Sequence, residues 1–437
     1  MSDAEEDVVA SLAWAGLSVD ESPVKAGPFA PYRQSERTNQ YLRHTVRLLH
    51  RGHAYYAFDT PEELDAMRKD GTFTYNAAGR MHMTNEFTLG SKELGRRLTS
   101  GEPYVVRLKT PEDRMVRFHD IIRGEVSVEA STLDDQVLLK SDGMPTYHLA
   151  NVVDDHLMNI THVIRGEEWL PSTPKHILLY EAFGWEPPNM AHLPLIMSPT
   201  GGKLSKRNAE KQGIPVLVRA YRDLGFEPEA VINFLALLGW NPGTEEEVFG
   251  LADLVDAFTL DRVGASGAQF SLDKLRWFNQ QHLRRLAAED LLARVRSSIH
   301  AHGITVSDAY LMRVLDLLRE RIVLAGSVAT EYGYFFAGPS AYDEKGVRKR
   351  WKDDSAGLLT AYADRLELLD PFDEEALESA LRTLAGEQEV GAGRIIHPVR
   401  LATSGSTFGP SLFGMLAVLG RDVCVRRLQR AVQVLGR

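Results

Sequence analysis

Cysteine is nearly absent from this sequence of 437 residues, and long apolar runs are missing altogether. The single cysteine, Cys424, excludes an internal disulfide framework and a zinc site made of clustered cysteines, so we expect no zinc and a reducing compartment, the cytoplasm. No run approaches the roughly 18 apolar residues of a membrane span, and we therefore expect no membrane partner. The acidic N-terminal residues lack the apolar centre of a signal peptide.

Positive charge is also in short supply, with 50 basic against 60 acidic side chains and a net charge of −10. This balance disfavours a protein that coats nucleic acid with its whole surface, but it allows RNA binding through local basic faces. Apolar residues make up 44% of the chain, which is ordinary for a globular protein. At about 150 residues a domain, the length corresponds to roughly three domains.

Strands and helices alternate between residues 137 and 207. This alternation predicts a parallel sheet, whose ligands bind at the carboxyl ends of its strands. Two such ends carry charge, because Arg165 lies at the end of the second strand and a basic loop follows the third. The predicted elements are strands over 137–139, 161–165 and 192–197, a helix over 147–158, and a helix that is capped by Ser172 or Thr173 and has Pro174 in its first turn.

Two further helices are predicted ahead of this part. An amphipathic pattern covers residues 4–17, and a second one covers 37–50 with Leu42, Val46 and Leu49 on one face. We expect that apolar face to be the buried one.

The remaining segments differ from each other in pattern. Residues 59–140 contain alternating stretches such as 104–109 and 125–128, which predict antiparallel strands of an inserted domain. From about residue 208 onward the pattern predicts helices almost throughout, including one over 307–326. The sequence as a whole predicts an α/β half followed by a helical body.

A basic loop after the third predicted strand is the most informative motif. Gly201 and Gly202 precede it as a hinge, and its two lysines can stabilise negative charge that develops on a nucleotide phosphate. A basic surface loop is the plainer alternative, and for five residues alone it is the more usual one. The motif is not a Walker loop, because Leu204 stands where that loop needs Ser or Thr. The loop residues are Lys203, Leu204, Ser205, Lys206 and Arg207.

Polar residues of the predicted helix over 147–158 form a second candidate. Tyr147 and Asn151 are four residues apart and share a face, as do Asn151 and Asp155, so this face can offer hydroxyl and amide groups to a small polar ligand. On spacing alone, a solvated helix face is the better explanation. The neighbouring histidines and aspartates do not recur at ligand spacings, so we predict no protein-built metal site there.

Arg165 is the third candidate. An arginine at the end of a strand can hold a carboxylate through two parallel hydrogen bonds. The alternative is an ion pair with Glu167 or Glu168, which follow closely in the chain. The residues leave these two interpretations equally open.

In their order along the chain, these motifs resemble those of the bacterial glutamyl-tRNA synthetase family. The resemblance runs from about residue 4 to the end and rests on five blocks at similar spacing, which makes it far more specific than any one block. The blocks are Tyr32–Arg37, Leu139–His156, Val163–Leu170, Lys203–Arg207, and a C-terminal stretch from Pro398 to Phe413.

The resemblance implies an α/β fold of the class I synthetase type. A Rossmann-type catalytic domain would cover residues 1–58 and 141–207, and an inserted α+β domain that binds the tRNA acceptor stem would cover 59–140. An all-α region would follow, with a stem-contact domain over 208–282 and a helical anticodon-binding domain over 283–437.

It also implies an activity and its partners. Family members activate L-glutamate with ATP, release pyrophosphate, and pass the glutamyl group from the adenylate to the 3′ end of tRNA(Glu) in protein synthesis. We therefore expect ATP, Mg²⁺ and tRNA as partners, with tRNA(Gln) as a further candidate, and a monomer. No protein ligand for the magnesium ion can be named from the sequence.

The family's functional residues carry over to the matching positions. Residues 203–207 match its ATP-binding signature loop, and within that loop we assign the catalytic role to Lys203 and Lys206, with Lys206 acting on ATP during activation. The glutamate pocket is matched by Tyr147, Asn151 and Arg165. Arg321 matches an arginine that reads the anticodon, although on its own it is equally a solvated helix charge.

One family signature has no counterpart where it is expected. The family has a His-x-Gly-His-like loop after its first strand, and residues 50–53 (His-Arg-Gly-His) fit only its letters. They follow a predicted helix with Gly52 as its cap, whereas the signature needs a strand before it and a helix after it. We therefore expect the signature to lie upstream of this chain. Either the start codon is placed too far downstream, or the chain really is short and its activity is absent or impaired. The other blocks are intact, which favours a misplaced start codon.

Three other functions compete with glutamate–tRNA ligase. A noncatalytic tRNA-binding protein on the same scaffold would bind tRNA without charging it, even with the upstream segment restored. The glutaminyl enzyme has a β-barrel anticodon region, which the helical pattern over 283–437 disfavours. A smaller relative that modifies tRNA-like substrates has no anticodon domain, and the long helical half disfavours it as well.

Overall fold

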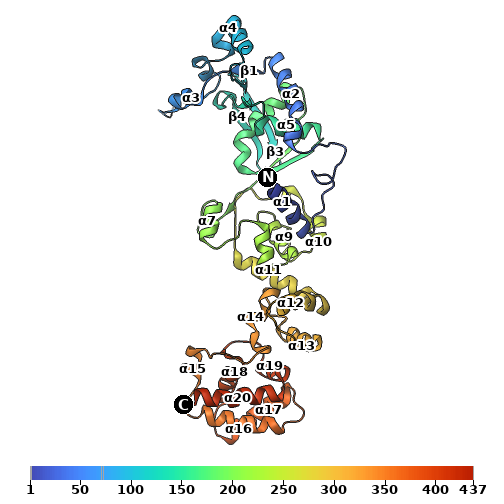
Figure 1. Cartoon of the computed structure of the whole chain (residues 1–437), viewed down its shortest axis with the longest axis vertical. Helices are drawn as coiled ribbons and strands as arrows, with labels where there is room; N and C mark the ends of the chain where they lie inside the picture. The colour runs from blue at the N-terminus through green and yellow to red at the C-terminus, as the bar shows by residue number, and fades with distance from the viewer. Residues whose placement is uncertain (1, 70, 72, 437) are drawn as a thin grey trace.

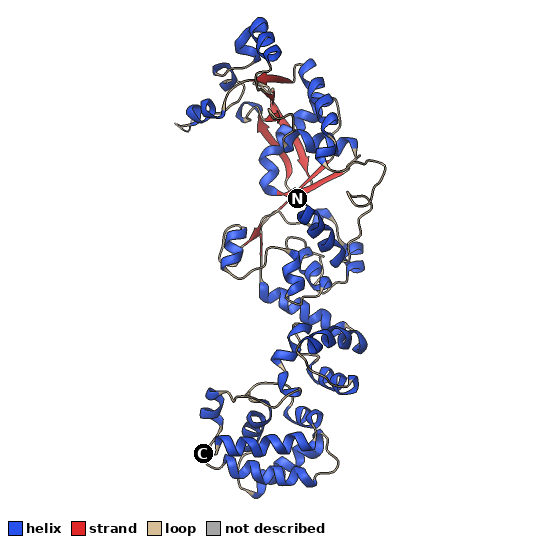
Figure 2. Ribbon diagram, viewed as in Figure 1, coloured by secondary structure: helices blue, strands red, loops and turns tan. Residues whose placement is uncertain are grey.

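The computed structural model describes residues 2–436 apart from residues 70 and 72. The molecule is elongated, with the described strands in the half that contains the N-terminus and a succession of helices leading to the C-terminus (Figures 1 and 2). Within the part described, no helix is long and apolar enough to cross a membrane. The predicted division into an α/β half and a helical body is confirmed.

A four-stranded sheet forms the centre of the α/β half. In the order β4-β3-β7-β6, β4 is antiparallel to β3, whereas β3 is parallel to β7 and β7 to β6. The helices that pack with it enclose an apolar core that includes Leu149, Leu179 and Phe183. These elements are α2 (Thr38–His50), β3 (Met115–Asp120), β4 (Gly124–Glu129), α5 (Tyr147–Leu157), β6 (His162–Gly166), α6 (Thr173–Phe183) and β7 (Asn189–Leu193).

A smaller antiparallel sheet, in the order β1-β2-β5, lies above it in Figure 1. Its elements are joined by Asp135, which is fully buried and accepts hydrogen bonds from Arg80 Nη2 at 3.2 Å and from the Tyr55 hydroxyl at 2.7 Å. The strands are β1 (Ala54–Ala57), β2 (Val105–Leu108) and β5 (Val137–Leu139), with helices α3 (Pro61–Arg68) and α4 (Glu86–Ser100) between β1 and β2.

The single strand expected over 192–197 is wrong. β7 ends at Leu193, before Pro194, which has no N–H to donate to a neighbouring strand. The chain then turns into β8 (Ile196–Met197), which pairs in parallel with β9 (Ala268–Gln269) and not with the main sheet. The basic loop therefore follows a separate two-stranded ribbon.

Helix α2 buries a different face from the one expected. Leu42 and Val46 are exposed, whereas Tyr41, Thr45 and Leu48 are buried. The two polar residues have partners there: the Tyr41 hydroxyl donates to Asp154 at 2.8 Å, and the Thr45 hydroxyl donates to a backbone carbonyl one turn earlier at 2.9 Å. Because the buried face of α2 includes polar side chains that form hydrogen bonds, the pattern of apolar residues alone does not identify this face.

The rest of the described chain is almost entirely helical. One core joins Trp14 of α1 to residues 204–278 and Leu324, and a second runs from Leu283 to Val432. The helix expected over 307–326 ends earlier, at Leu318. The helices are α1 (Ser2–Trp14), α7 (Lys206–Lys211), α8 (Val218–Asp223), α9 (Pro228–Ala236), α10 (Leu251–Ala257), α11 (Leu272–Arg285), α12 (Ala288–Ala301), α13 (Asp308–Leu318), α14 (Val328–Glu331), α15 (Glu344–Arg350), α16 (Ser355–Leu368), α17 (Glu374–Glu387), α18 (Gly393–Ser404), α19 (Leu412–Leu419) and α20 (Arg421–Leu435).

Candidate active site

Arg165, near the end of β6, is the centre of the candidate site. Its guanidinium donates from Nε to His192 Nε2 at 3.0 Å, from Nη1 to the Tyr147 hydroxyl at 3.2 Å, and from Nη2 to Thr173 Oγ1 at 2.9 Å and His176 Nδ1 at 3.3 Å. All these partners are uncharged acceptors. A partly buried cation with neutral partners is well suited to a ligand carboxylate, because the carboxylate supplies the missing charge.

The alternative for Arg165, an ion pair with one of the glutamates that follow, is wrong. In the described chain Glu167 pairs with Arg123, and Glu168 pairs with Lys203 at 3.5 Å. Both carboxylates lie on the short 3-10 helix Glu167–Ser172, which carries them away from the guanidinium. Arg165 is therefore left free to bind an outside anion.

Tyr147 and Trp169 form an aromatic wall beside Arg165. Their ring centroids are 4.4 Å apart at an angle of 43°, and both rings remain about two-fifths exposed, at 40% and 37%. Tyr147 is the first residue of α5, so its hydroxyl reaches Arg165 while its ring stays open to solvent. This arrangement brings together Tyr147 and Arg165, two of the three residues that match the family's glutamate pocket.

Asn151 lies one turn further along α5, where the helix face is not solvated. Its Oδ1 is buried and has no hydrogen-bond partner among the described residues, and the same is true of the Tyr180 hydroxyl on α6. A buried polar atom without a partner is costly, so such atoms mark places where a ligand or water completes the bonding. The expected solvated face is thus wrong for Asn151, although no hydrogen bond joins Asn151 to Arg165 in the part of the chain that the structure describes.

Asp155, on the same face of α5, provides a testable effect of pH on stability. Burial, and then the charge of Asp154, raise its pKa from 3.8 to about 6. Because the folded protein holds this proton more tightly than the unfolded chain, stability falls as pH rises from about 4 to 6 and stays lower above that range. We expect Asp155→Asn to stabilise the protein by roughly 1–3 kcal/mol at pH 8 and hardly at all at pH 4.

Urea unfolding at the two pH values measures this effect. The matched control is Asp256→Asn, which removes an exposed carboxylate from α10 and should leave the midpoint unchanged at both. An equal shift for Asp155→Asn at pH 4 and pH 8 would show that ionisation of this carboxyl is not the cause.

The basic loop follows β8 and contacts the segment after Arg165 through Lys203. It forms a tight turn in which Gly201 and Gly202 have φ of 93° and 74°, values that favour glycine, and Ser198 N–H donates to the Gly202 carbonyl at 2.8 Å. Lys203 reaches Glu168, three residues after Arg165 in the chain. Of the predicted ATP residues, only Lys203 is thereby tied to the Arg165 segment.

The other four loop residues have distinct surroundings. Leu204 packs against the core that contains Phe226, and the Ser205 side chain caps α7 by accepting from Asn208 N–H at 3.3 Å. Lys206 and Arg207, in the first turn of α7, are exposed and form no hydrogen bond or ion pair from their side chains within the described chain. Exposed cations of this kind are available to a phosphate-bearing ligand.

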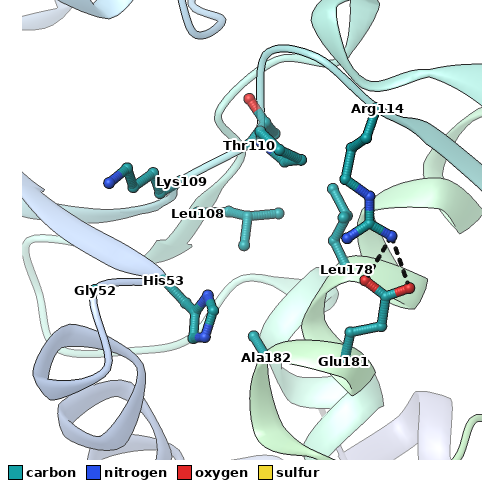
Figure 3. Close-up of a pocket in the computed structure, with 10 residues that line it drawn as sticks. Gly52, His53, Leu108, Lys109, Thr110, Arg114, Leu178, Glu181 and Ala182 are labelled. Carbon is teal, nitrogen blue, oxygen red and sulfur yellow. Dashed lines mark hydrogen bonds and ion pairs between the residues drawn. The ribbon is translucent and has the colours of Figure 1, made fainter.

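Residues 50–53 do not have the strand–loop–helix context of the His-x-Gly-His-like signature, as expected from the sequence. His50 is the last residue of α2, Gly52 in the turn that follows has φ of 70°, and β1 comes next, so no helix opens from this loop. His53 lines a pocket of about 510 Å³ together with Lys109, while Arg114 and Glu181 form a 2.9 Å ion pair at its other side (Figure 3). None of the ten residues that line this pocket is a predicted ATP or glutamate residue.

The Tyr32–Arg37 block has a structural role. Arg37 donates to Asp154 at 2.8 Å and to the backbone carbonyls of Phe29 and Pro31, at 3.2 and 2.9 Å, and its side chain is only 6% exposed. Asp154 precedes Asp155 on α5. The block therefore fixes α5, which carries Tyr147 and Asn151, against the N-terminal part of the chain.

Arg321 lies far from this site, just after α13. Arg321 is exposed. The pKa of the nearby Arg400 is lowered mainly by the burial of Arg400, and the positive charge of Arg321 lowers it further. Two arginines in proximity favour an anionic ligand. No carboxylate pairs with Arg321 in the part of the chain that the structure describes.

Three residues around Arg165 were missed as functional candidates: His176, His192 and Thr173. Thr173 was considered only as a helix cap and His192 only as a member of an apolar strand. The one sequence signal for His192 is that it is a polar residue within an otherwise apolar run. Its side chain is fully buried, and a buried polar group needs polar partners. The register between β6 and β7 could not be predicted from the sequence, yet this register places Arg165 opposite His192.

The sheet, the inserted strands, the basic loop and the helical body define a class I aminoacyl-tRNA synthetase. A family model described as tRNA synthetases class I (E and Q), catalytic domain, matches residues 1–277. A second, described as an anticodon binding domain, matches residues 283–432.

The chain belongs to the glutamate–tRNA ligases. It is 44% identical over 99% of its length to that of Christiangramia forsetii, and 45% identical over 99% to that of Chloroherpeton thalassium, covering 89% and 88% of those proteins. The crystal structure of a glutamate tRNA ligase from Elizabethkingia meningosepticum in complex with its amino acid superposes with a TM-score of 0.92 at 40% identity, over all of this chain and 90% of that one. The crystal structure of the glutamate-tRNA synthetase from Elizabethkingia anophelis superposes with a TM-score of 0.90 at 40% identity, over 99% of this chain and 90% of that one.

Proposed function

We propose that this chain activates L-glutamate with ATP and transfers the glutamyl group to the 3′ end of tRNA(Glu). The observation that carries the proposal is the environment of Arg165, a cation at a strand end whose described partners are all neutral. Family membership supports the reaction, and the separate basic loop supports the use of a nucleotide. A noncatalytic tRNA-binding protein would need neither feature.

In this proposal Tyr147, Asn151 and Arg165 bind glutamate. Arg165 pairs with one of its carboxylates, and the Tyr147 hydroxyl helps to hold the guanidinium in place. The unpartnered Oδ1 of Asn151 is an acceptor, so it suits the ammonium group or another donor of the ligand.

Residues 203–207 bind ATP in this proposal, with Lys203 and Lys206 as the catalytic cations. Negative charge develops on the α-phosphate while the glutamate carboxylate displaces pyrophosphate, and a lysine that is already in place stabilises it. Lys203 would exchange its ion pair with Glu168 for a phosphate. The described residues contain no group of three His, Cys, Asp or Glu side chains arranged for a metal, so we assign Mg²⁺ to the ATP phosphates and route no step through a protein ligand.

The domain assignments remain part of the proposal: a catalytic domain over 1–58 and 141–207, an acceptor-stem domain over 59–140, a stem-contact domain over 208–282, and an anticodon-binding domain over 283–437. We also propose that the protein acts as a monomer in the cytoplasm, where tRNA is charged.

Arg321 is proposed to read the anticodon. We expect Arg321→Ala to raise the KM for tRNA(Glu) about tenfold, because one base contact contributes about 1–3 kcal/mol, with little change in the KM for glutamate. The control is Arg348→Ala, since Arg348 is 78% exposed and, among the described residues, pairs only with Glu344 on its own helix. Steady-state charging with varied tRNA measures both, and equal effects of the two substitutions would contradict a specific role.

The proposed function is tested by charging of tRNA(Glu) and tRNA(Gln) transcripts with labelled glutamate or glutamine. We expect glutamate on tRNA(Glu), and the tRNA(Gln) arm determines whether the enzyme discriminates between the two tRNAs. Binding of tRNA without charging, by a protein that also carries the upstream signature, would favour the noncatalytic alternative, and charging with glutamine would favour the glutaminyl enzyme.

A further inference from the structure

A buried carboxylate and a buried histidine lie directly behind Arg165. Asp120 ends β3 and His192 lies on β7, and both side chains are fully buried. His192 pairs in register with Arg165 on β6, and it lies two residues from Met190, which pairs with Asp120. Because side chains two residues apart point to the same face of a sheet, all three side chains meet on one face.

The hydrogen bonds fix which histidine nitrogen carries the proton. Asp120 Oδ2 lies 2.5 Å from His192 Nδ1, and Asp120 Oδ1 accepts from the backbone N–H groups of Ile122 and Arg123 at 3.0 and 2.9 Å. A carboxylate engaged in this way accepts from Nδ1–H. The other nitrogen, Nε2, then has a free lone pair, and it lies 3.0 Å from Arg165 Nε, which can only donate.

Charge states agree with this arrangement. Burial alone would raise the pKa of Asp120, but the hydrogen bonds from His192 and the backbone outweigh it and lower the pKa, so the carboxyl is ionised. Burial lowers the pKa of His192, against the hydrogen bond to Asp120, and the charges of Arg165 and Arg123 lower it as well. The imidazole is therefore neutral and can accept.

We propose that Asp120 and His192 are positioning residues, which hold the Arg165 guanidinium in its glutamate-binding orientation by keeping His192 in the tautomer that accepts from Arg165. The proposal rests on the proposed role of Arg165 in glutamate binding. Neither residue touches the ligand. If the tautomer were reversed, an Nε2–H would face the Arg165 Nε–H, and the two donors would repel each other.

Asp120→Asn tests the tautomer, because its amide can keep the backbone hydrogen bonds while its NH₂ group donates to His192 Nδ1. The proton then moves to Nε2, which can donate to Thr173 Oγ1 at 3.1 Å, and Arg165 Nε loses its acceptor. Loss of a partner that orients a ligand-binding group costs roughly 10–100-fold at metal sites, and we expect a KM for glutamate raised by about that factor, with the KM for ATP nearly unchanged. In an Arg165→Gln background, Asp120→Asn should have no further effect on glutamate.

Controls separate positioning from mere stability. Asp135→Asn alters an equally buried carboxylate that pairs with Arg80 near the other sheet, so it should lower the melting temperature without changing the KM for glutamate. His192→Gln supplies an amide oxygen that can accept from Arg165 and should largely preserve the KM, whereas His192→Ala should not.

Long-range ¹H–¹⁵N spectra of the histidine rings give a readout that does not depend on activity. We expect Nδ1–H for His192 in the wild-type chain and Nε2–H in Asp120→Asn. An Nε2–H tautomer in the wild type, or a normal KM for glutamate in a variant whose tautomer has changed, would overturn the inference. Failure of the wild-type chain to bind glutamate in calorimetry would instead overturn the proposed function.

Discussion

Lys206→Ala is expected to lower the rate of glutamate-dependent ATP–pyrophosphate exchange, measured with tRNA(Glu) present, by about 10²–10³-fold. The lysine ammonium would stabilise charge that exists only as pyrophosphate leaves, so its loss should lower kcat more than it raises the KM for ATP. The affinity for tRNA, measured separately by filter binding, should change less than threefold.

The short helix α7 offers a matched control for that substitution. Lys211 ends the helix that Lys206 begins, and it is also exposed. Lys211→Ala removes the same charge from the same element, so a general electrostatic effect of the loop would appear in both variants. A normal exchange rate in Lys206→Ala, or an equal loss in the two variants, would show that the role assigned to Lys206 is wrong.

Arg165→Gln is expected to raise the KM for glutamate by about 10²–10³-fold, which corresponds to about 3–4 kcal/mol. The penalty is large because the substrate carboxylate would enter a partly buried site and lose the guanidinium that pairs with it. The KM for ATP should change little, since the proposed ATP residues lie on the separate basic loop.

Arg117→Gln is the matched control for Arg165→Gln. Arg117 lies on β3 of the same sheet and is exposed, so its replacement removes a surface charge of the same kind. We expect unchanged kinetics and stability. If Arg165→Gln alters the KM for ATP as strongly as the KM for glutamate, disruption of the whole sheet edge would explain the result better than loss of a carboxylate partner.

Much of the fold was predictable, because its signals are local. Periodicity placed α5, β6 and most of the helical body. The buried face of α2 was not predicted correctly, because it contains the polar side chains of Tyr41 and Thr45, whose hydrogen bonds allow them to be buried. The strand over 192–197 was misread because the effect of Pro194 on pairing depends on which strand would have been its neighbour.

The candidate site was predictable in its centre but not in its surroundings. The position of Arg165 at a strand end is a local feature, whereas its contacts with Tyr147, Thr173 and His192 depend on how β6, β7, α5 and α6 pack. The choice between a ligand carboxylate and Glu167 as the partner of Arg165 was open in the sequence. The structure removes the Glu167 alternative, because Glu167 pairs with Arg123, a residue that was not considered in the sequence.

The central claim is that this chain is a glutamate–tRNA ligase whose amino acid is selected by Arg165. The most direct test is the attachment of labelled glutamate to tRNA(Glu), with wild-type, Arg165→Gln and Arg117→Gln proteins compared at several glutamate concentrations. The account predicts charging by the wild type and by Arg117→Gln at the same KM, and charging by Arg165→Gln only at about 10²-fold higher glutamate or above. Equal KM values for all three proteins, or no charging by the wild type, would contradict it.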